Sequence, residues 1–252
     1  MITILTIKSM GRRLGRRARA GYPRSPMPAT RLLDLFHRLR GAYGPQDWWP
    51  GDGPFEVVVG AILTQRTAWR NVERAIEGLR ECGLLSVEAI GGAPVERVAD
   101  SIRPAGFYNV KAKKLKTFVA CLIERHNGDL SRLLSLPTDD LREELLGLFG
   151  IGEETADAIL VYAAGRTGFV IDAYARRLLA RLGWIDGGER YRDLRDLFLS
   201  ALPSDVDLLG EFHALIVRHG KTHCRSSPIC NGCPIRSACA AGGVAGEREA
   251  SR

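Results

Sequence analysis

Apolar residues recur at helical spacing along almost the whole chain, whereas no segment shows the polar–apolar alternation of a strand between hairpin turns. Residues 55–65 are almost entirely apolar, which predicts a buried central helix. Residues 30–44 carry a stripe formed by Leu32, Leu33, Phe36 and Leu39. Further helices are predicted over residues 67–82, 86–91, 94–102, 109–126, 138–148, 153–165, 172–183, 190–201 and 205–218. The fold is therefore predicted to be all-α.

The predicted helices divide between two lobes. Residues 46–163 form a continuous stretch that would close into one helical barrel. The second lobe would combine residues 28–45 with residues 164–240. A length of 252 residues suffices for one large core or two modest ones. No sequence feature indicates an oligomer, so we expect a monomer.

The chain is basic, with 36 Lys and Arg against 29 Asp and Glu and a net charge of +7. Much of the excess lies in residues 1–27, which we expect to be a disordered basic tail. Residues 241–252 are expected to be a second disordered tail. A basic balance suits a nucleic acid, but a run of arginines is equally often a solvated segment.

Nothing in the sequence predicts a membrane protein. No uncharged apolar stretch reaches the roughly 18 residues that indicate a membrane-spanning helix. The first apolar run precedes the arginines of residues 1–27, which is the reverse of the order in a secretory signal. We therefore expect a cytoplasmic protein, associated with the nucleoid if the cell is bacterial.

Four of the six cysteines lie within sixteen residues near the C-terminus, at the spacing C-x5-C-x2-C-x5-C. In a cytosolic protein such a cluster favours a metal over disulfides. Four thiolates fit either a tetrahedral zinc site or an iron–sulfur cubane, and the spacing leaves both open. The other two, Cys82 and Cys121, lie in apolar helical patterns and are expected to be core residues. The four candidate ligands are Cys224, Cys230, Cys233 and Cys239.

A short glycine-containing turn joins the predicted helices over 138–148 and 153–165. Gly150 and Gly152 flank Ile151, whose side chain would fill the gap between the two helices. The glycines would let the backbone approach a partner closely, and the N–H groups at the start of the second helix would attract a phosphate. Such contacts position a DNA backbone without reading its sequence. The same Gly-x-Gly also fits an ordinary helical hairpin.

The wider sequence favours the DNA-binding interpretation. The run LFGIGEETADAILVYAAGRTGFVIDAYARRLLARLG resembles the helix-hairpin-helix, glycine-rich loop and aspartate of the endonuclease III superfamily of DNA glycosylases. GAILTQRTAWRNVERAI resembles the early helix pair of that family with its Gln, and IRPAGFYNVKAKKLK resembles the segment with its Gly-x-Tyr-Asn turn. HGKTHCRSSPICNGCPIRSAC resembles the family's cluster loop. These matches cover roughly residues 30–240 in the order that the family has them.

This resemblance implies a two-lobed fold in which residues 46–163 contain the helix-hairpin-helix and the other lobe carries a [4Fe–4S] cluster on the four cysteines. The family's commonest first gap between cysteines is one residue longer, so this loop is a variant. The loop would hold the end of the chain and present Arg225 and Arg236 to phosphate. The implied partner is double-stranded DNA that contains a damaged base.

The resemblance also identifies a catalytic carboxylate. Asp172 matches the superfamily's catalytic aspartate, and Asp also suits a helix N-cap. It would stabilise the positive charge on the deoxyribose as the base leaves, or orient the attacking water. Bifunctional members carry a lysine immediately before a Thr-Ala pair, where this chain has Glu154 before Thr155. A carboxylate cannot form a Schiff base, so the usual route to strand cleavage is missing.

Three of the four tryptophans fall within 22 residues, as Trp48, Trp49 and Trp69. Core packing explains any one of them. However, DWWPGDGPFEVVVGAILTQRTAW resembles the 3-methyladenine branch of the superfamily, which also tends to lack the lysine. An electron-rich aromatic pocket would favour cationic purines. Alkylation at N3 weakens the glycosidic bond, so a lone aspartate would suffice.

Base flipping leaves a gap in the duplex that a side chain must fill. The resemblance makes Gln65 the candidate filler and Phe107 the candidate wedge; a polar helix end and a core anchor are the alternatives. The lysines Lys111, Lys113, Lys114 and Lys116 would contact phosphate or form a solvated face. The remaining candidate DNA contacts are the hairpin residues Gly150, Ile151, Gly152 and Thr155.

The leading hypothesis is a monofunctional DNA glycosylase of base excision repair that acts on alkylated purines such as 3-methyladenine. The first alternative is an endonuclease III-like glycosylase for oxidised pyrimidines or mismatched bases, with weak lyase activity. The second alternative is a non-catalytic DNA-binding module. Asp172 favours an enzyme, because a degenerate binder has no use for a carboxylate at that place.

Overall fold

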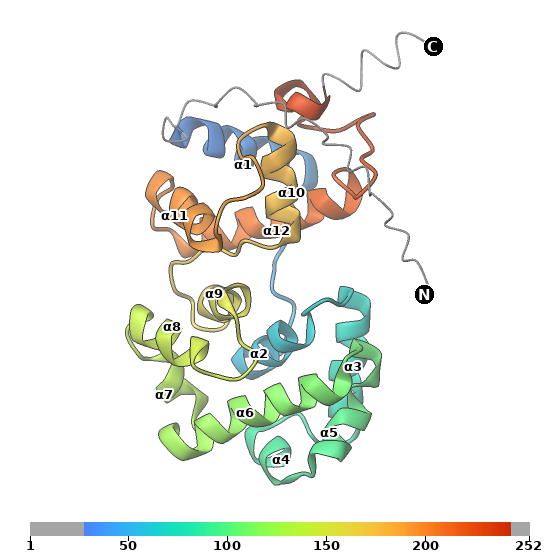
Figure 1. Ribbon diagram of the computed structural model, residues 1–252, viewed down its shortest axis with the longest axis vertical. Helices are drawn as coiled ribbons and strands as arrows, with labels where there is room; N and C mark the ends of the chain where they lie inside the picture. The colour runs from blue at the N-terminus through green and yellow to red at the C-terminus, as the bar shows by residue number, and fades with distance from the viewer. Residues whose placement is uncertain (1–27, 243–252) are drawn as a thin grey trace, which may run out of the picture.

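The computed structural model describes residues 28–242, within which every regular element is helical, as the periodicity predicts. The expected tail over 1–27, and residues 243–252 of the other, lie outside the described residues. Residues 241 and 242 belong to the structure, where the N–H of Gly242 donates to the carbonyl of Cys239 at 3.0 Å. Figure 1 shows the elements, which are α1 (Ala29–Tyr43), α2 (Pro54–Leu63), α3 (Trp69–Glu81), α4 (Val87–Gly92), α5 (Val95–Ser101), η1 (Arg103–Ala105), α6 (Tyr108–His126), α7 (Leu130–Leu134), α8 (Thr138–Leu146), α9 (Glu153–Tyr162), α10 (Ala173–Leu182), α11 (Tyr191–Ala201), α12 (Val206–Thr222) and η2 (Arg236–Ala238).

The apolar stripes bury as their spacing predicts. In α3 the buried side chains are Val72, Ala75, Ile76 and Leu79, one face of an amphipathic helix. Helix α2 is different, because all seven residues from Val57 to Leu63 are buried. It begins at Pro54, whose missing N–H is harmless in the first turn of a helix. Helix α2 is therefore the buried central helix that the sequence predicts.

The buried side chains form two hydrophobic cores. The first consists of residues from α2 to α9 together with Val170. The second consists of residues from α1, α10, α11 and α12, joined by Phe169, Ile171, Cys224 and Ile235. Figure 1 shows α1, α10, α11 and α12 at one end of the molecule, α2 to α8 at the other, and α9 between them. The residue boundaries of the two predicted domains stay a prediction.

A buried ion-pair network ties α9 to both ends of the molecule. The carboxylate of Asp157 is fully buried. Its Oδ1 lies 2.8 Å from Arg142 Nε of α8, and its Oδ2 lies 3.3 Å from Arg195 Nε of α11. A buried carboxylate is costly without such partners. The network therefore couples the last helix of the first core to the second core.

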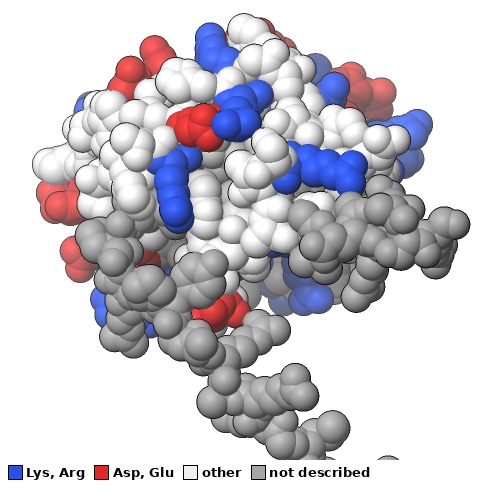
Figure 2. Space-filling model, turned by 90° about the horizontal axis from the view of Figure 1, so that it is seen from above, with Lys and Arg blue, Asp and Glu red and all other residues white. Residues whose placement is uncertain are grey.

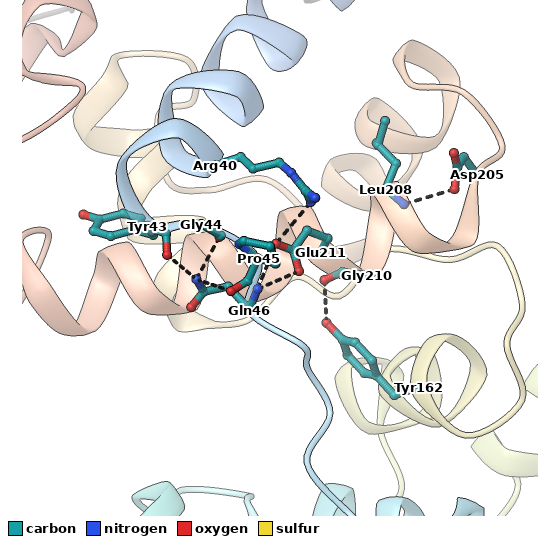
Figure 3. Close-up of polar contacts among 10 residues, drawn as sticks. All are labelled: Arg40, Tyr43, Gly44, Pro45, Gln46, Tyr162, Asp205, Leu208, Gly210 and Glu211. Carbon is teal, nitrogen blue, oxygen red and sulfur yellow. Dashed lines mark hydrogen bonds and ion pairs between the residues drawn. The ribbon is translucent and has the colours of Figure 1, made fainter.

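The segment that crosses from α1 to α2 is anchored on α12 (Figure 3). The backbone N–H of Gln46 donates to both carboxylate oxygens of Glu211, at 3.0 and 3.2 Å. Arg40 Nη1 lies 3.4 Å from the same carboxylate. The hydroxyl of Tyr162 donates to the carbonyl of Gly210 at 3.0 Å, which holds α9 against α12. These bonds position the chain immediately before Trp48.

The sequence-based prediction lacks the short helices α7, η1 and η2, and it ends α12 too early. Helix α7 has five residues, too few to show a period, and its start is fixed by the Asp129 side chain, which accepts the Ser131 N–H at 2.8 Å. Helix α12 continues to Thr222, beyond the predicted end at residue 218, and so carries Lys221. Within residues 28–242 no helix is long and apolar enough to cross a membrane.

Basic side chains do not form one continuous patch at the end of the molecule where α1 lies. Seen from that end, Lys and Arg alternate with Asp, Glu and uncharged residues over the visible surface (Figure 2). The net charge of the chain therefore does not mark this face as a binding surface for a polyanion.

Candidate active site

A cavity of about 490 Å³ brings together residues of both cores. Asp172 and His213 line it from the second core's side, and Glu154 lines it from the start of α9. A larger cavity of about 670 Å³ also touches Trp48 and Trp49, but Asp172 is not among its lining residues. The smaller cavity is therefore the candidate active site, and its aromatic and charged lining comprises Trp48, Trp49, Trp69, Arg66, Glu154, Asp172, Tyr174, His213 and Lys221.

Asp172 caps a helix and faces the cavity at the same time. Its Oδ1 accepts the backbone N–H of Ala175 at 2.8 Å, which fixes the start of α10. Its Oδ2 lies 3.6 Å from Nε2 of His213. The N-cap interpretation of the sequence is thus confirmed. The cap uses only Oδ1, so Oδ2 of Asp172 is free of the cap and lies beside the cavity.

The three tryptophans of the sequence prediction form one aromatic cluster. The ring centroids of Trp48 and Trp69 are 4.9 Å apart, and Trp49 lies 5.2 Å from each of the other two. All three side chains are half-buried and line the cavity. Trp69 Nε1 donates to Glu73 at 2.8 Å. The tryptophans therefore pack against one another as core residues do, while presenting aromatic surface to the cavity.

A lysine shares this aromatic surface. The Nζ of Lys221 lies 5.5 Å from the ring centroid of Trp48, within reach of a cation–π interaction. Partial burial lowers the pKa of Lys221, although the Asp172 carboxylate acts in the opposite direction. The sequence prediction missed this residue, because its helix was expected to end before position 221.

Glu154, which the sequence resemblance matches to the lysine of bifunctional members, lines the cavity. Burial of the carboxyl group, and then the neighbouring charge of Asp172, raise the pKa of Glu154. The carboxyl groups of Glu154 and Asp172 can take part in acid–base chemistry, but the start of α9 offers no amine that could form a Schiff base.

The glycine turn between α8 and α9 has the geometry that the sequence predicts. Gly150 has a φ of +79°, which disfavours any residue with a side chain, and an added Cβ would overlap the side chain of Lys114. Ile151 is 5% exposed and packs in the first core. Phe149, by contrast, is 58% exposed at the tip of the turn. The glycines therefore set the shape of the turn, and the isoleucine anchors it.

The first turn of α9 carries two acidic residues, Glu153 and Glu154. The free N–H groups of a helix N-terminus attract anions, and these carboxylates compete with an external phosphate for that attraction. Arg142 Nη2 lies 3.6 Å from Glu153 and partly neutralises it. The exposed Gly152 leaves the backbone at the very start of the helix accessible.

Gln65 contacts the turn, and Phe107 is exposed at the start of α6. The Gln65 amide donates to the carbonyl of Gly150 at 3.0 Å and to Thr155 Oγ1 at 2.9 Å, and Lys114 donates to its oxygen. Phe107 is 65% exposed, so it is not the core anchor that the alternative interpretation requires. It has a φ of +47°, and the guanidinium of Arg66 lies 5.8 Å from its ring centroid.

Two of the four lysines in α6 correct the sequence prediction. Lys111 is 2% exposed, and its Nζ donates to the carbonyls of Leu63 and Ala105, both at 2.8 Å. Lys116 donates to the carbonyls of Ile90, Gly91 and Ala93. Neither residue is available to phosphate or belongs to a solvated face. Both satisfy carbonyl groups at the ends of other helices, a pattern that helical spacing does not reveal.

We expect the replacement of Lys111 by Met to destabilise the protein by about 3 kcal/mol, because it leaves two buried carbonyls without their donor. Burial lowers the pKa of Lys111 to about 8, which reflects the cost of keeping its charge inside the protein. Urea unfolding measures the change, with Lys113→Met on the exposed face of the same helix as the control. Equal stability of the two variants would contradict the structural role.

The four C-terminal cysteines line one small cavity, to which α10 and α12 also contribute side chains. Burial raises the pKa of the Cys233 thiol, and the charges of the other three cysteines act in the same direction. His219 approaches them from α12, with its Nε2 4.0 Å from Cys233 Sγ. Burial lowers the pKa of His219 to about 4, so this imidazole is neutral at physiological pH.

The donor set and its surroundings fit an iron–sulfur cluster. Four thiols face one cavity that is otherwise lined largely by apolar side chains such as Leu178 and Ile235. Arg181 Nη1 donates to Cys224 Sγ at 3.2 Å. Among the described residues, the grouping of ligand atoms that all lie within 4.8 Å is Cys121, His126 and Glu144, not the four cysteines. Four thiols are also the ligand set of a tetrahedral zinc site, and metal analysis distinguishes the two.

The basic residues of the loop have partners within the chain. Arg225 Nε donates to the carbonyl of Lys221 at 2.8 Å, although its side chain is exposed. Arg181 also donates to the carbonyls of Arg225 and Ser226. Arg236 lies in η2, between Cys233 and Cys239. Contact of Arg225 and Arg236 with phosphate stays a prediction.

The fold and this site define a class, the helix-hairpin-helix DNA glycosylases. Residues 59–204 match the family model described as the HhH-GPD superfamily base excision DNA repair protein, and the chain belongs to this superfamily. It is 45% identical over 210 residues to "Putative DNA repair glycosylase MJ1434" of Methanocaldococcus jannaschii, covering 82% of this chain and 95% of that protein. It is 32% identical to endonuclease III of Sulfolobus acidocaldarius, covering 73% of this chain and 81% of that protein.

Solved structures agree with this membership. The chain resembles the Helicobacter pylori 3-methyladenine DNA glycosylase bound to 1,N6-ethenoadenine, with 28% identity, a TM-score of 0.67 and coverage of 77% of this chain and 98% of that one. A non-covalent endonuclease III–DNA complex matches the fold with a TM-score of 0.76 at 22% identity, over 88% of this chain and 99% of that one. Base excision by a DNA glycosylase is therefore the activity of the family to which the chain belongs.

The structure adds three residues that the sequence prediction did not single out, Tyr162, His213 and Lys221. Tyr162 and His213 bond to each other at 2.6 Å, and His213 faces Asp172. A histidine within the apolar run FHALIV was the signal available in the sequence. Its meaning depends on which helix packs beside α12, and that information is not local.

Proposed function

We propose that the protein is a monofunctional DNA glycosylase that hydrolyses the N-glycosidic bond of a damaged base, preferably an alkylated purine such as 3-methyladenine. The observation that carries the proposal is the cavity in which Asp172 faces three clustered tryptophans. Glu154 in place of the lysine supports the monofunctional assignment. The cavity, about 490 Å³, is of the size that takes a single base.

Asp172 supplies the charge that the reaction needs. As the base departs, positive charge develops on the deoxyribose, and a fixed carboxylate beside the sugar lowers the energy of that state. Oδ1 is held by the N-cap hydrogen bond, so the carboxylate does not have to reorganise during the reaction. The same logic governs the carboxylates of enzymes that cleave sugar–sugar bonds.

The electrostatics of the cavity bear on the choice of base. The tryptophan rings provide stacking surface, and the carboxylates of Asp172 and Glu154 add negative charge that favours a cationic purine. Lys221 opposes this preference, because its ammonium already lies over Trp48. The H. pylori relative, named for 3-methyladenine and bound to an enlarged adenine, supports a purine substrate. Lys221 and the similarity to endonuclease III favour the alternative, a glycosylase for oxidised or mismatched pyrimidines.

A panel of damaged duplexes tests the proposal. Alkylated DNA, a thymine-glycol duplex and a uracil duplex are incubated with the protein and analysed with and without alkali. We expect release of 3-methyladenine, with strand breaks only after alkali, because Glu154 cannot form the Schiff base that leads to strand cleavage. Excision confined to the pyrimidine lesions would select the endonuclease III-like alternative. Binding to all duplexes without any excision would select the non-catalytic module.

We further propose that the surface around the glycine turn contacts the DNA. The exposed ring of Phe107 suits a wedge between base pairs, and the hydrogen bonds of Gln65 place it beside the turn as a filler. The backbone near the turn would approach a phosphate. The contacts proposed in the turn are Gly150, Ile151, Gly152 and Thr155, with Ile151 acting through its anchoring of the turn. Affinity should fall steeply with salt, as phosphate contacts require.

The cofactor that we propose is a [4Fe–4S] cluster held by Cys224, Cys230, Cys233 and Cys239, which fix the segment after α12 against α10. Such a cluster supplies a closed structural site and, in principle, one-electron chemistry. The reaction at Asp172 does not use it. We propose a monomer that acts on DNA in the cytoplasm, associated with the nucleoid if the cell is bacterial.

A further inference from the structure

His213 is a buried histidine whose second nitrogen points at the proposed catalytic carboxylate. The residue lies on α12, is 6% exposed and lines the candidate active site. Within the described part of the chain, its Nε2 is buried and has no hydrogen-bond partner. That nitrogen lies 3.6 Å from Oδ2 of Asp172, which is too far for a direct hydrogen bond. An unpartnered polar atom at such a depth needs an explanation.

The hydrogen bonds on the other side of the ring determine which nitrogen carries the proton. The Tyr162 hydroxyl has one proton, and it donates that proton to the carbonyl of Gly210 at 3.0 Å. The contact of 2.6 Å between the Tyr162 oxygen and Nδ1 of His213 then requires Nδ1 to be the donor. A neutral His213 therefore has its lone pair on Nε2, directed at the carboxylate side of the cavity.

Nε2 of His213 and Oδ2 of Asp172 are both acceptors, and a molecule with two donor protons could bond to both of them. A water molecule has two protons, so it can donate one to Nε2 of His213 and the other to Oδ2 of Asp172. The lone pairs of its oxygen then point away from both acceptors. We propose that His213 is the general base of the hydrolysis, positioned by Tyr162 and acting on a water that Asp172 also holds. This inference rests on the proposed glycosylase function and adds a second catalytic residue to it.

The step balances without any other reactant. The bond between C1′ and the base nitrogen breaks, and the base departs with the electron pair. The water oxygen forms a bond to C1′, and its proton passes to Nε2 of His213. The resulting imidazolium is stabilised by the Asp172 carboxylate and later loses its proton to solvent. General base catalysis of this kind contributes about 100-fold to 10,000-fold in rate.

The charge environment of His213 comes from three helices. Tyr162 and Glu154 face it from α9, Asp172 faces it from the start of α10, and Lys221 lines the same cavity from α12. The pKa of Tyr162 is raised well above its ordinary value by burial, so its hydroxyl stays protonated and can accept from Nδ1 at all accessible pH values. The proposed role requires a neutral imidazole, because the lone pair on Nε2 accepts the proton of the water.

The role of His213 is tested by measuring the single-turnover excision rate and the DNA affinity of variants. The substrate is the duplex of the panel that the wild-type protein cleaves. We expect His213→Gln to lower the excision rate about 100-fold or more at neutral pH while the Kd changes less than about 2-fold. In His213→Ala, added imidazole should restore part of the rate, which a purely structural role would not allow. His37→Gln, at an exposed position on α1, is the control.

Tyr162→Phe provides a second variant that removes the partner of Nδ1 without touching the histidine. We expect a smaller loss of rate, about 10-fold. Wild-type rates in His213→Gln and Tyr162→Phe, with excision by the parent protein intact, would overturn the role of His213 alone. An absence of excision by the wild-type protein on every duplex would overturn the proposed function and this inference together.

Discussion

Replacement of Asp172 by asparagine is expected to lower excision at least about 1,000-fold while DNA binding stays unchanged. Asparagine keeps the shape of the side chain and an oxygen that can accept the Ala175 N–H, so α10 retains its cap. It removes the negative charge, which is the feature that stabilises a positively charged sugar. The loss should therefore appear in the single-turnover rate and not in the Kd or in thermal stability.

Asp205→Asn is a matched control for this experiment. Asp205 is the N-cap of α12, and its side chain accepts the Leu208 N–H at 3.1 Å, but it does not line the candidate active site. The two variants make the same chemical change at the same kind of position. Excision that survives in Asp172→Asn would show that another carboxylate supplies the charge, and Glu154 would be the first to examine.

The residues that the sequence located most directly are those whose role is local. The stripe of α3, the positive φ of Gly150 and the N-cap at Asp172 each depend on a few neighbouring residues. Helix periods and turn preferences act over that range, so the pattern in the sequence carries the information. The similarity to a known superfamily extended these local predictions to a site that combines distant segments.

The sequence could not reveal partnerships between helices that are far apart in the chain. Lys111 resembles a surface lysine in its own helix, yet its ammonium is buried against carbonyls 6 and 48 residues away in the sequence. Tyr162 and His213 are separated by 51 positions, and only the packing of α9 on α12 makes them partners. Tertiary contacts decide the role of such residues, and no local propensity encodes them.

The other large effect is expected from the cysteine segment. We expect the purified protein to contain about four iron and four sulfide per chain, and Cys233→Ser to lose most of both. Loss of the group that joins this segment to α10 should destabilise the second core by about 4 kcal/mol or more, which for a chain of this size lowers the thermal midpoint by roughly 10 °C. Metal analysis and thermal unfolding measure the two effects.

Cys82→Ser is the control for the loss of any cysteine. The prediction that Cys82 is a core residue is wrong, because Cys82 is exposed where α3 ends, in the part of the chain that builds the first core. The Cys82→Ser variant should keep both the iron and the thermal midpoint. One zinc per chain in place of iron would contradict the cluster. Lys221 and His213 line the candidate active site and lie on α12, the helix that leads into the cysteine segment. If Cys233→Ser lowers excision, we therefore expect the cause to be displacement of α12 and not redox chemistry at the active site. Activity in that variant should therefore decline in parallel with the folded fraction of the second core.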